Sequence, residues 1–298
     1  MRSSCICKKT SSFKPYIAYK NETVFKAYEG TIIGQCESCG ILRTFPSEKN
    51  KLFNPLITKA EDYQKRKKEF ETLFTPLTEA VENNIKRGGT VLDVGCSSGI
   101  LLSLLKRKGY EIWGIEPNKQ AFAVAKKNLK KNIFNMTMEQ FLMSLRGSRR
   151  TSADVAISTG LLRSARNDKL VFDCIIYNHV LEHIEDVNGE FLLIKSALKK
   201  NGILIIGVPN TDNIIFKIRR KYWESLLPNE HVWHFNTKYL KRYLTKQGFK
   251  ILETSFEDDA RKSYPFHKQI YFRLLSLMNE LFFTGEAVLI VAKKQATC

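Results

Sequence analysis

The sequence predicts an α/β fold built on a parallel sheet, and two observations carry that prediction. Residues 90–102 form an apolar run that stops at Gly95 and restarts after Gly99 as an apolar helix. This pattern is typical of a buried strand, a tight glycine turn and a helix whose N-terminus faces a ligand. Further apolar runs, each closed by a turn, follow at 111–117, 172–183 and 198–210 and supply other strands.

The spacing of the first turn separates two kinds of nucleotide-like ligand. A dinucleotide fingerprint requires G-x-G-x-x-G, whereas Ser97 stands two residues after Gly95. The pattern that is present is D-x-G-x-x-x-G, formed by Asp93, Gly95 and Gly99. Glu116 ends the second run, about twenty residues later, where an acidic side chain can accept both hydroxyls of an adenosine ribose.

Four segments resemble, in order, the motifs of class I S-adenosylmethionine-dependent methyltransferases: VLDVGCSSG, GIEPN, FDCIIYNHVLEHIED and LKKNGILIIGVPN. The resemblance implies S-adenosylmethionine as cofactor and a Rossmann-like seven-stranded sheet in the order 3-2-1-4-5-7-6, with helices on both faces. It also implies a set of cofactor-binding residues: Asp93, Gly95, Cys96, Gly99, Glu116, Pro117, Asn118, Met138, Glu139, Asn178 and His179. Within this set Met138 and Glu139, at the end of a third strand over 133–138, are expected to contact the adenine.

Residues 1–50 contain four of the seven cysteines, Cys5, Cys7, Cys36 and Cys39. The C-x2-C-G of the second pair is typical of half a zinc ribbon, while the first pair, C-x-C, is one residue shorter than usual. Tetrahedral thiolate coordination would allow so short a segment to fold, so we predict a zinc-binding knuckle on a small hairpin. Four unligated thiols are the alternative. A knuckle ahead of such a domain resembles a bacterial group associated with sugar and polysaccharide modification.

Two further segments complete the domain organisation. Residues 51–89 form a helical lead-in, with apolar side chains at helical spacing and a break at Pro76. The resemblance implies that this lead-in lies over the cofactor site, and packing on the sheet edge is the alternative. Residues 90–298 form the methyltransferase domain. Its segment 146–168 is rich in Arg and Ser, which indicates an inserted surface loop or, alternatively, an arginine-rich substrate arm.

Elements after the fourth motif follow from local signals. An amphipathic helix is expected over 236–247, with Asn236 or Thr237 as its cap and its end at Gly248. A strand is expected over 249–256, a long helix over 265–283 and a last strand over 286–292. In the fold that the chain resembles, this last strand inserts antiparallel between its neighbours.

The predicted chemistry needs little from the protein beyond alignment. Methyl transfer from a sulfonium is an in-line displacement, so the chain must hold the nucleophile in line and exclude water. A general base is needed only for a hydroxyl or a protonated amine. His183 is the predicted base, with Glu182 as its orienter or as a cation ligand. His231 and His234 are the second choice, beside Trp233 as an apolar or sugar-stacking wall. A structural hydrogen bond is the alternative role for each histidine.

Composition sets the class of partner. The formal net charge is +18, which indicates an anionic partner, such as a phosphate-bearing sugar, an acidic polymer, nucleic acid or a membrane surface, or simply aids solubility. No apolar run could span a bilayer, and the N-terminus lacks a secretory apolar region, so a cytoplasmic protein is predicted. The predicted function is methyl transfer to a small molecule or saccharide precursor. Nucleic-acid or protein methylation and non-catalytic cofactor binding are the alternatives.

Overall fold

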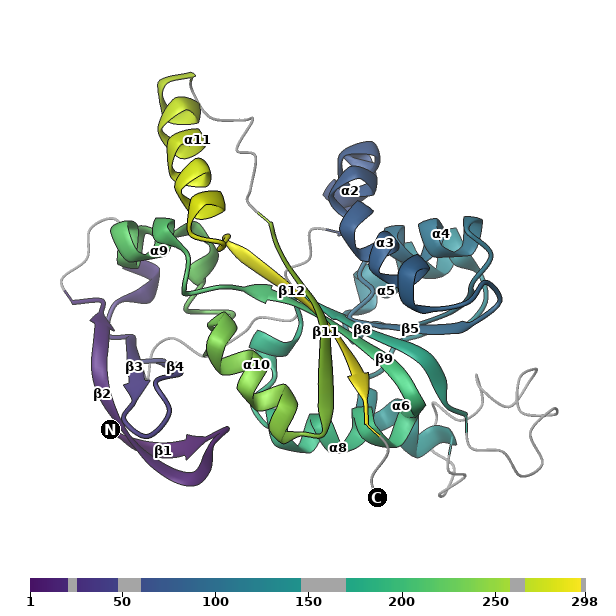
Figure 1. The fold of residues 1–298 in the computed structure, drawn as a ribbon, viewed down its shortest axis with the longest axis horizontal. Coiled ribbons are helices and arrows are strands. Elements are labelled where there is room, and N and C mark those ends of the chain that lie inside the picture. The colour runs from purple at the N-terminus through teal and green to yellow at the C-terminus, as the bar shows by residue number, and fades with distance from the viewer. Residues whose placement is uncertain (21–25, 48–59, 146–169, 258–265, 296–298) are drawn as a thin grey trace. The chain divides into compact units, whose positions relative to one another are not determined.

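A computed structural model describes residues 1–20, 26–47, 60–145, 170–257 and 266–295 (Figure 1). The predicted insertion at 146–168 lies outside these residues. The chain divides into two compact units. The first consists of Met1–Asn54, Asn178–Val187 and Ile206–Ala292, and the second of Pro55–Tyr177, Asn188–Ile205 and Lys293–Cys298.

Parallel strands form the centre of a seven-stranded sheet. β5 (Thr90–Val94) pairs in parallel with β6 (Glu111–Ile115) and β8 (Phe172–Asn178), and β6 pairs with β7 (Ile133–Phe134). With β9 (Leu198–Pro209), β11 (Phe249–Glu257) and β12 (Ala287–Lys294), the strand order is β11-β12-β9-β8-β5-β6-β7. Counted from β5 along the chain, this reads 6-7-5-4-1-2-3 across the sheet. Side chains of β5 and β8 are almost completely buried, which explains their continuous apolar runs.

The described residues of the helical lead-in form three short helices. α1 (Ala60–Lys65) and α2 (Lys67–Leu73) precede α3 (Thr75–Asn84), and Pro76 lies in the first turn of α3. A proline is tolerated there because that turn has backbone N–H groups with no partner in the helix. The described residues that follow also contain α4 (Ile100–Arg107), α5 (Lys119–Leu129), α6 (Met138–Leu145) and α8 (Val187–Ala197).

The third predicted strand is shorter than expected. It ends at Phe134, and Met138 begins α6 instead of closing the strand. A reciprocal capping pair accounts for the early helix start, because the backbone N–H of Thr137 donates to Gln140 Oε1 at 3.0 Å and the N–H of Gln140 donates to Thr137 Oγ1 at 3.3 Å. In the fourth motif, β9 (Leu198–Pro209) is one continuous strand that includes Gly202.

The cysteine-containing segment forms a sheet larger than the predicted hairpin. β1 (Arg2–Cys5), β2 (Lys8–Ala18), β3 (Ile32–Cys36) and β4 (Leu42–Phe45) pair antiparallel in chain order. β10 (Trp233–His234) adds a fifth strand beside β4. The described residues of the first unit also contain four short helical turns, η1 (Lys26–Tyr28), η3 (Leu181–His183), η4 (Arg220–Tyr222) and η5 (Glu224–Leu226).

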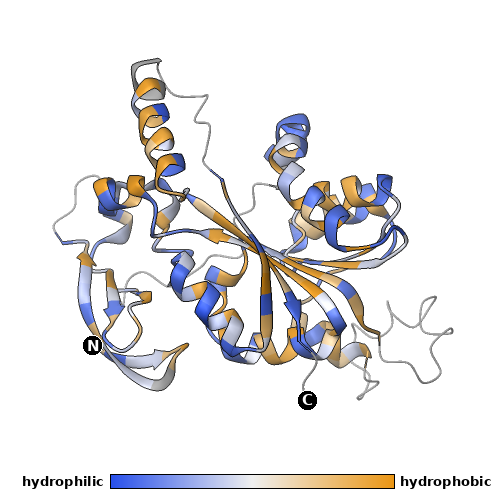
Figure 2. Ribbon diagram, in the orientation of Figure 1, coloured by the Kyte–Doolittle hydropathy of each residue, from blue (hydrophilic) through white to orange (hydrophobic). Residues whose placement is uncertain are grey.

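Helices and strands of the C-terminal part complete the first unit. They are α9 (Ile214–Arg219), α10 (Thr237–Lys246), β11 (Phe249–Glu257), α11 (Phe266–Leu281) and β12 (Ala287–Lys294). Tyr19 and Ile33 of the N-terminal sheet share one apolar core with Phe216, Trp223 and Phe272. Hydrophobic residues run along most of α11 (Figure 2). Within the described residues, no helix has the length and apolar character needed to cross a membrane.

Candidate functional site

The turn after β5 requires glycine at two positions. Gly95 and Gly99 have φ angles of 71° and 76°, in the left-handed region that favours glycine. A Cβ on Gly99 would stand 2.7 Å from Leu129 Cδ1 of α5. The backbone N–H groups of Gly95 and Cys96 both donate to the carbonyl of Ile115, at 2.8 and 3.1 Å. The glycine turn is thereby held against the end of β6.

Glu116 joins this turn to the next one. Its carboxylate is buried, and its two oxygens accept from the backbone N–H groups of Ser97 at 2.9 Å and Asn118 at 2.8 Å. Burial raises the pKa of Glu116, although these two hydrogen bonds act to lower it. Each carboxylate oxygen has a second lone pair, so Glu116 can still accept hydrogen bonds from ligand hydroxyls.

Asp93 is a second buried carboxyl at the same edge of the parallel strands. Its pKa is raised to about 8, first by burial and then by the negative charge of Glu116. An opposite charge beside a buried carboxyl favours its ionised form. A cationic group of a ligand would therefore stabilise its ionised form.

The other residues predicted for the cofactor contribute in different ways. Burial raises the pKa of the Cys96 thiol, so this residue offers backbone groups rather than thiolate chemistry. Asn118 Oδ1 caps α5 by accepting from the N–H groups of the next turn. Pro117 and Glu139 are exposed, whereas Met138 is buried at the start of α6. Hydrogen bonds therefore join the turn that contains Gly95, Cys96 and Gly99 to Glu116 and Asn118 around the ends of β5 and β6, and Asp93 lies in β5 just before this turn.

Two residues that the sequence analysis did not identify connect other elements to this arrangement. Asn135 Nδ2 donates to the carbonyls of Glu116 and Pro117, at 2.8 and 2.9 Å, and so holds the end of β7 against the end of β6. Gln64 Nε2 of α1 donates to the carbonyl of Ser98 at 3.1 Å, which brings the lead-in to the glycine turn. Single asparagine and glutamine residues carry no motif signal, so only the fold reveals these roles.

Asn178, the last residue of β8, and His179, which follows it, belong to the first unit together with the histidine loops. His179 has a φ of 54°, an uncommon value for a residue with a side chain, and its N–H donates to the carbonyl of Gly207 at 2.8 Å. A Cβ on Gly207 would collide with Asn178 Oδ1. Because Gly207 has no Cβ, the side chain of Asn178 can lie directly against β9.

Glu182 is the most unusual side chain of this loop. It is 1% exposed, and neither of its carboxylate oxygens has a hydrogen-bond partner within the described residues. His179 Nδ1 lies 3.4 Å and His231 Nε2 lies 4.0 Å from its Oε1. Burial would raise the pKa of Glu182, but the neighbouring histidines outweigh that effect and lower it to about 2. The reciprocal effect raises the pKa of His179 against the lowering effect of burial.

His183 and His231 place their rings together beside Glu182. The ring centroids are 4.8 Å apart and the rings meet edge to face at 75°. His183 Nδ1 lies 2.8 Å from the carbonyl oxygen of Glu230. Because a carbonyl can only accept, Nδ1 carries the proton, and the lone pair of the neutral ring lies on Nε2. Burial, together with the other histidines, lowers the pKa of His231 to about 4 although Glu182 acts to raise it.

His234 and Trp233 have structural surroundings in β10. His234 Nε2 lies 2.8 Å from Thr44 Oγ1, and burial lowers the pKa of His234 to about 3. Trp233 is 1% exposed, and the guanidinium of Arg43 lies 4.8 Å from its ring centroid. The expectation that Trp233 forms a sugar-stacking wall is therefore wrong, because its ring is covered by the protein itself.

Four thiols from the N-terminal hairpins converge at one point. Cys5 Sγ lies 3.4 Å from Cys7 Sγ and 3.7 Å from Cys39 Sγ, and Cys7 Sγ lies 3.8 Å from Cys36 Sγ. Sulfur atoms about 2.3 Å from a tetrahedral zinc are about 3.8 Å from one another. The hydrogen bond from Cys5 lowers the pKa of Cys39 to about 5 against the opposing effect of burial. The four thiols have the spacing and the chemistry of a zinc ligand set.

A second group of metal-compatible atoms belongs to the histidine loops. Glu182, His183 and His231 each offer one ligand atom, and these atoms lie within 4.8 Å of one another. One carboxylate with two imidazoles can hold a divalent cation. The same atoms can serve acid–base chemistry without a metal.

Comparison with known proteins identifies a family model and several relatives that match this chain. A family model described as a methyltransferase domain matches residues 64–254. A protein named ubiquinone biosynthesis O-methyltransferase, from Glaesserella parasuis, is 28% identical over 192 residues, which cover 61% of this chain and 75% of that protein. A protein named ribosomal protein L11 methyltransferase, from Dictyoglomus thermophilum, is 31% identical over 128 residues, 43% of this chain and 35% of that protein.

The extent of these matches differs between relatives. Across four proteins named ubiquinone biosynthesis O-methyltransferase, the chain spans from 42% to 75% of their length. Among solved structures, a SAM-dependent methyltransferase from Archaeoglobus fulgidus superposes with a TM-score of 0.51 at 19% identity, covering 75% of this chain and 94% of that chain. At this identity the likeness concerns the fold.

Proposed function

Because the matched residues 64–254 make up more than half of the chain, this protein belongs to the methyltransferase-domain family, and we propose that it transfers the methyl group of S-adenosylmethionine to a hydroxyl of a small-molecule acceptor. The first support is the pair of buried carboxyls Asp93 and Glu116 beside the glycine turn. Glu116 would accept hydrogen bonds from the ribose hydroxyls, and Asp93 would face the cationic part of the cofactor. The second support is the name of the relatives, whose acceptor atom is oxygen.

The observation that carries the acceptor chemistry is the hydrogen bond between His183 Nδ1 and the carbonyl of Glu230. It orients the Nε2 lone pair of His183 as a proton acceptor for a hydroxyl. When bound, the cofactor supplies a methyl group already activated by the sulfonium charge. His183 takes the hydroxyl proton as the oxygen attacks, and the ionised Glu182 stabilises the imidazolium that forms. His231 packs against His183 and keeps its ring in place.

Substitution of the base tests this mechanism. We expect His183→Ala to lower kcat by roughly 10²- to 10⁴-fold, the usual contribution of a general base, while the Kd for S-adenosylmethionine stays unchanged. Turnover to S-adenosylhomocysteine with a pool of phenols, catechols and hydroxylated sugars is the measurement, and calorimetry gives the Kd. Asp186→Asn, an exposed acid of the same loop, is the control. Unchanged turnover in His183→Ala would remove it as the base.

The same assay separates the competing explanations. Loss of turnover after EDTA, with recovery on adding Mg²⁺, would assign Glu182, His183 and His231 as cation ligands instead. Ribosomal protein added to the acceptor pool tests the activity that is named for the second relative. Methyl transfer to that protein alone would contradict a small-molecule acceptor.

We also propose that Cys5, Cys7, Cys36 and Cys39 hold a structural zinc ion. The proposal rests on their converging sulfur atoms and on the two hairpins that carry them. We expect about one zinc per chain by plasma mass spectrometry, because a tetrahedral thiolate site binds a single ion. Cys36→Ser should lose the metal and lower the Tm, while Cys298→Ser, outside the described residues, should retain it. A zinc-free wild-type protein that folds normally would contradict the proposal.

A further inference from the structure

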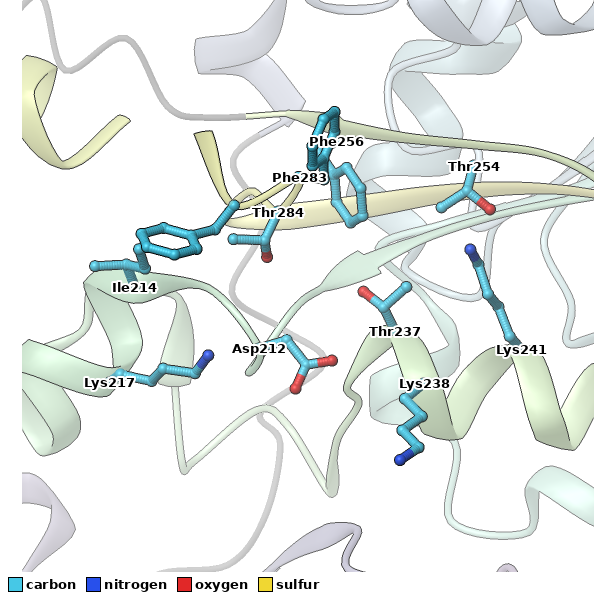
Figure 3. Close-up of a pocket in the computed structure, with 11 residues that line it drawn as sticks. Asp212, Ile214, Lys217, Thr237, Lys238, Lys241, Thr254, Phe256, Phe283 and Thr284 are labelled. Atoms are coloured by element: carbon cyan, nitrogen blue, oxygen red, sulfur yellow. The ribbon is translucent and has the colours of Figure 1, made fainter. Parts of the chain in front are cut away.

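The described part of the first unit contains a cavity of about 890 Å³, separate from the side chains considered so far (Figure 3). Its volume is in the range of small-molecule binding sites. Asp212, Lys217, Thr237, Lys241, Phe256 and Phe283 are among the residues that line it. They come from the turn after β9, from α9 and α10, from the end of β11 and from the segment between α11 and β12.

Asn210 holds these elements together from below the surface. Its side chain is fully buried, and Nδ2 donates to Thr284 Oγ1 at 3.1 Å and to the carbonyl of Gly285 at 2.9 Å. Its Oδ1 accepts from the N–H of Asp212 at 3.0 Å and from Thr237 Oγ1 at 3.1 Å. One buried amide therefore fixes three of the segments that line the cavity, which makes it a built site rather than a gap between loops.

The charged side chains of the cavity are mostly cationic. Lys217, Lys238 and Lys241 line it, with Asp212 as the carboxylate. The amino groups of Lys217 and Lys241 are directed toward the cavity, while that of Lys238 points away (Figure 3). None of these lysines forms an ion pair within the residues that the structure describes. Two unpaired ammonium groups at one opening attract an anionic group.

An apolar wall faces these lysines. Phe256, Phe282 and Phe283 line the cavity, and Phe282 and Phe283 are 62% and 86% exposed. They directly follow α11, where Leu274, Leu277 and Leu281 are also exposed. Asn279 Oδ1 accepts from the N–H of Ile214 at 2.9 Å and ties this end of α11 to α9. Large apolar side chains exposed beside a cavity are typical of a surface that binds an apolar ligand.

The histidine loop and the turn that lines the cavity follow two neighbouring strands, β8 and β9. The carbonyl of Gly207 in β9 accepts from the N–H of His179, and Asn210 comes three residues after Gly207, directly after the end of β9. Glu257, whose pKa is raised by burial against the lowering effect of His179, is next to Phe256 of the cavity. A molecule in the cavity would therefore lie at the edge of the sheet that carries the histidines.

We propose that this cavity binds an anionic amphiphile, a molecule in which a carboxylate or phosphate is joined to an apolar body. The anionic group would contact Lys217 and Lys241, and the apolar body would cover Phe256, Phe282 and Phe283. Thr237 and Asp212 offer hydrogen bonds to hydroxyls near the anionic group. The binding of this molecule is independent of the proposed function. Its further role as the methyl acceptor rests on the proposed function.

Equilibrium binding of defined probes to the full-length protein tests the proposal. Decanoate carries a carboxylate and decyl phosphate carries a phosphate, each on the same ten-carbon apolar chain. Inorganic phosphate lacks the apolar chain, and decyltrimethylammonium lacks the anionic group. We expect both anionic amphiphiles to bind at least about tenfold more tightly than the other two probes, by calorimetry below their micelle concentrations. The preferred of the two identifies the anionic group.

Variants locate the binding. Lys217→Ala with Lys241→Ala should weaken binding of the preferred probe by roughly tenfold or more, and Phe283→Ala should weaken it several-fold. Lys246→Ala, an exposed lysine of the same helix as Lys241, should leave it unchanged. Circular dichroism and the Kd for S-adenosylmethionine check that each variant is folded.

The outcomes keep the two proposals distinguishable. Equal binding of decyltrimethylammonium, binding of phosphate alone, or binding that survives the double lysine substitution would each overturn the cavity proposal. Binding only to vesicles of phosphatidylglycerol, and not to dispersed probes, would also overturn it and indicate a membrane surface. Tight probe binding without any cofactor binding would overturn the methyl-transfer proposal and leave the cavity proposal intact.

Discussion

At the scale of single residues, the buried carboxyl of Asp93 lowers the stability of the fold at neutral pH and is proposed to favour binding of the cationic cofactor. Asp93 has a raised pKa of about 8 in the folded protein, against an ordinary value of 3.8. The folded state therefore retains a proton that the unfolded chain releases between these values. Stability from this group is fully present below pH 3.8 and is lost as the pH rises toward 8.

Asp93→Asn should separate the two effects. The amide cannot ionise, so we expect the variant to be more stable than wild type by about 1–3 kcal/mol at pH 8, with a smaller difference at pH 5. Its affinity for S-adenosylmethionine should fall, because the cationic ligand loses a carboxylate. Denaturant unfolding and calorimetry at both pH values are the measurements. A constant stability difference across pH would mean that Asp93 does not titrate in this range.

At the scale of elements, the cysteine-containing sheet supports the loop that carries Glu182 and His183. The backbone N–H of Val232 donates to the carbonyl of Glu182 at 2.9 Å, and the N–H of Thr44 in β4 donates to the carbonyl of Val232 at 2.9 Å. Arg43 Nη1 donates to the carbonyl of Ser4 at 2.6 Å. A zinc ion at the ends of the hairpins would therefore stabilise the histidine loop through the sheet.

Arg43 provides the sharpest test of this support. It is almost buried, its Nη2 lies 3.0 Å from Glu185 Oε1, and its guanidinium lies over the ring of Trp233. Arg43→Met keeps the stem but leaves the Ser4 and Glu185 oxygens without this donor. We expect kcat to fall roughly tenfold, with the Kd for S-adenosylmethionine unchanged, since Asp93, Gly95 and Glu116 belong to the other unit. Arg107→Met, which breaks an exposed ion pair with Glu71, is the control. Equal effects of both variants would contradict a positioning role.

At the scale of the whole molecule, the residues proposed to bind the cofactor and those proposed to handle the acceptor belong largely to different units of the chain. Asp93, Gly95 and Glu116 are in the second unit, whereas Glu182 and His231 are in the first. The seven-stranded sheet contains strands from both units. The net charge of +18 is spread over both units, and Lys217 and Lys241 place two of the positive charges at the cavity.

The sequence by itself determined the features that depend on short spacing. The glycine turn, the offset of Glu116 and the C-x2-C-G knuckle are local patterns, because backbone conformation and neighbouring ligands act within a few residues. The capping pair of Thr137 and Gln140 is local too, and it explains why the third strand is shorter than its apolar run suggested.

Only the tertiary structure decided which distant residues meet. It brought His231 beside Glu182 and His183, joined the two cysteine pairs, added β10 to the N-terminal sheet and covered Trp233 with Arg43. It also built the cavity around Asn210, which no motif marks. Such contacts join residues that are far apart in the chain. They depend on how complete faces of sheets and helices pack, so no short window of sequence contains them.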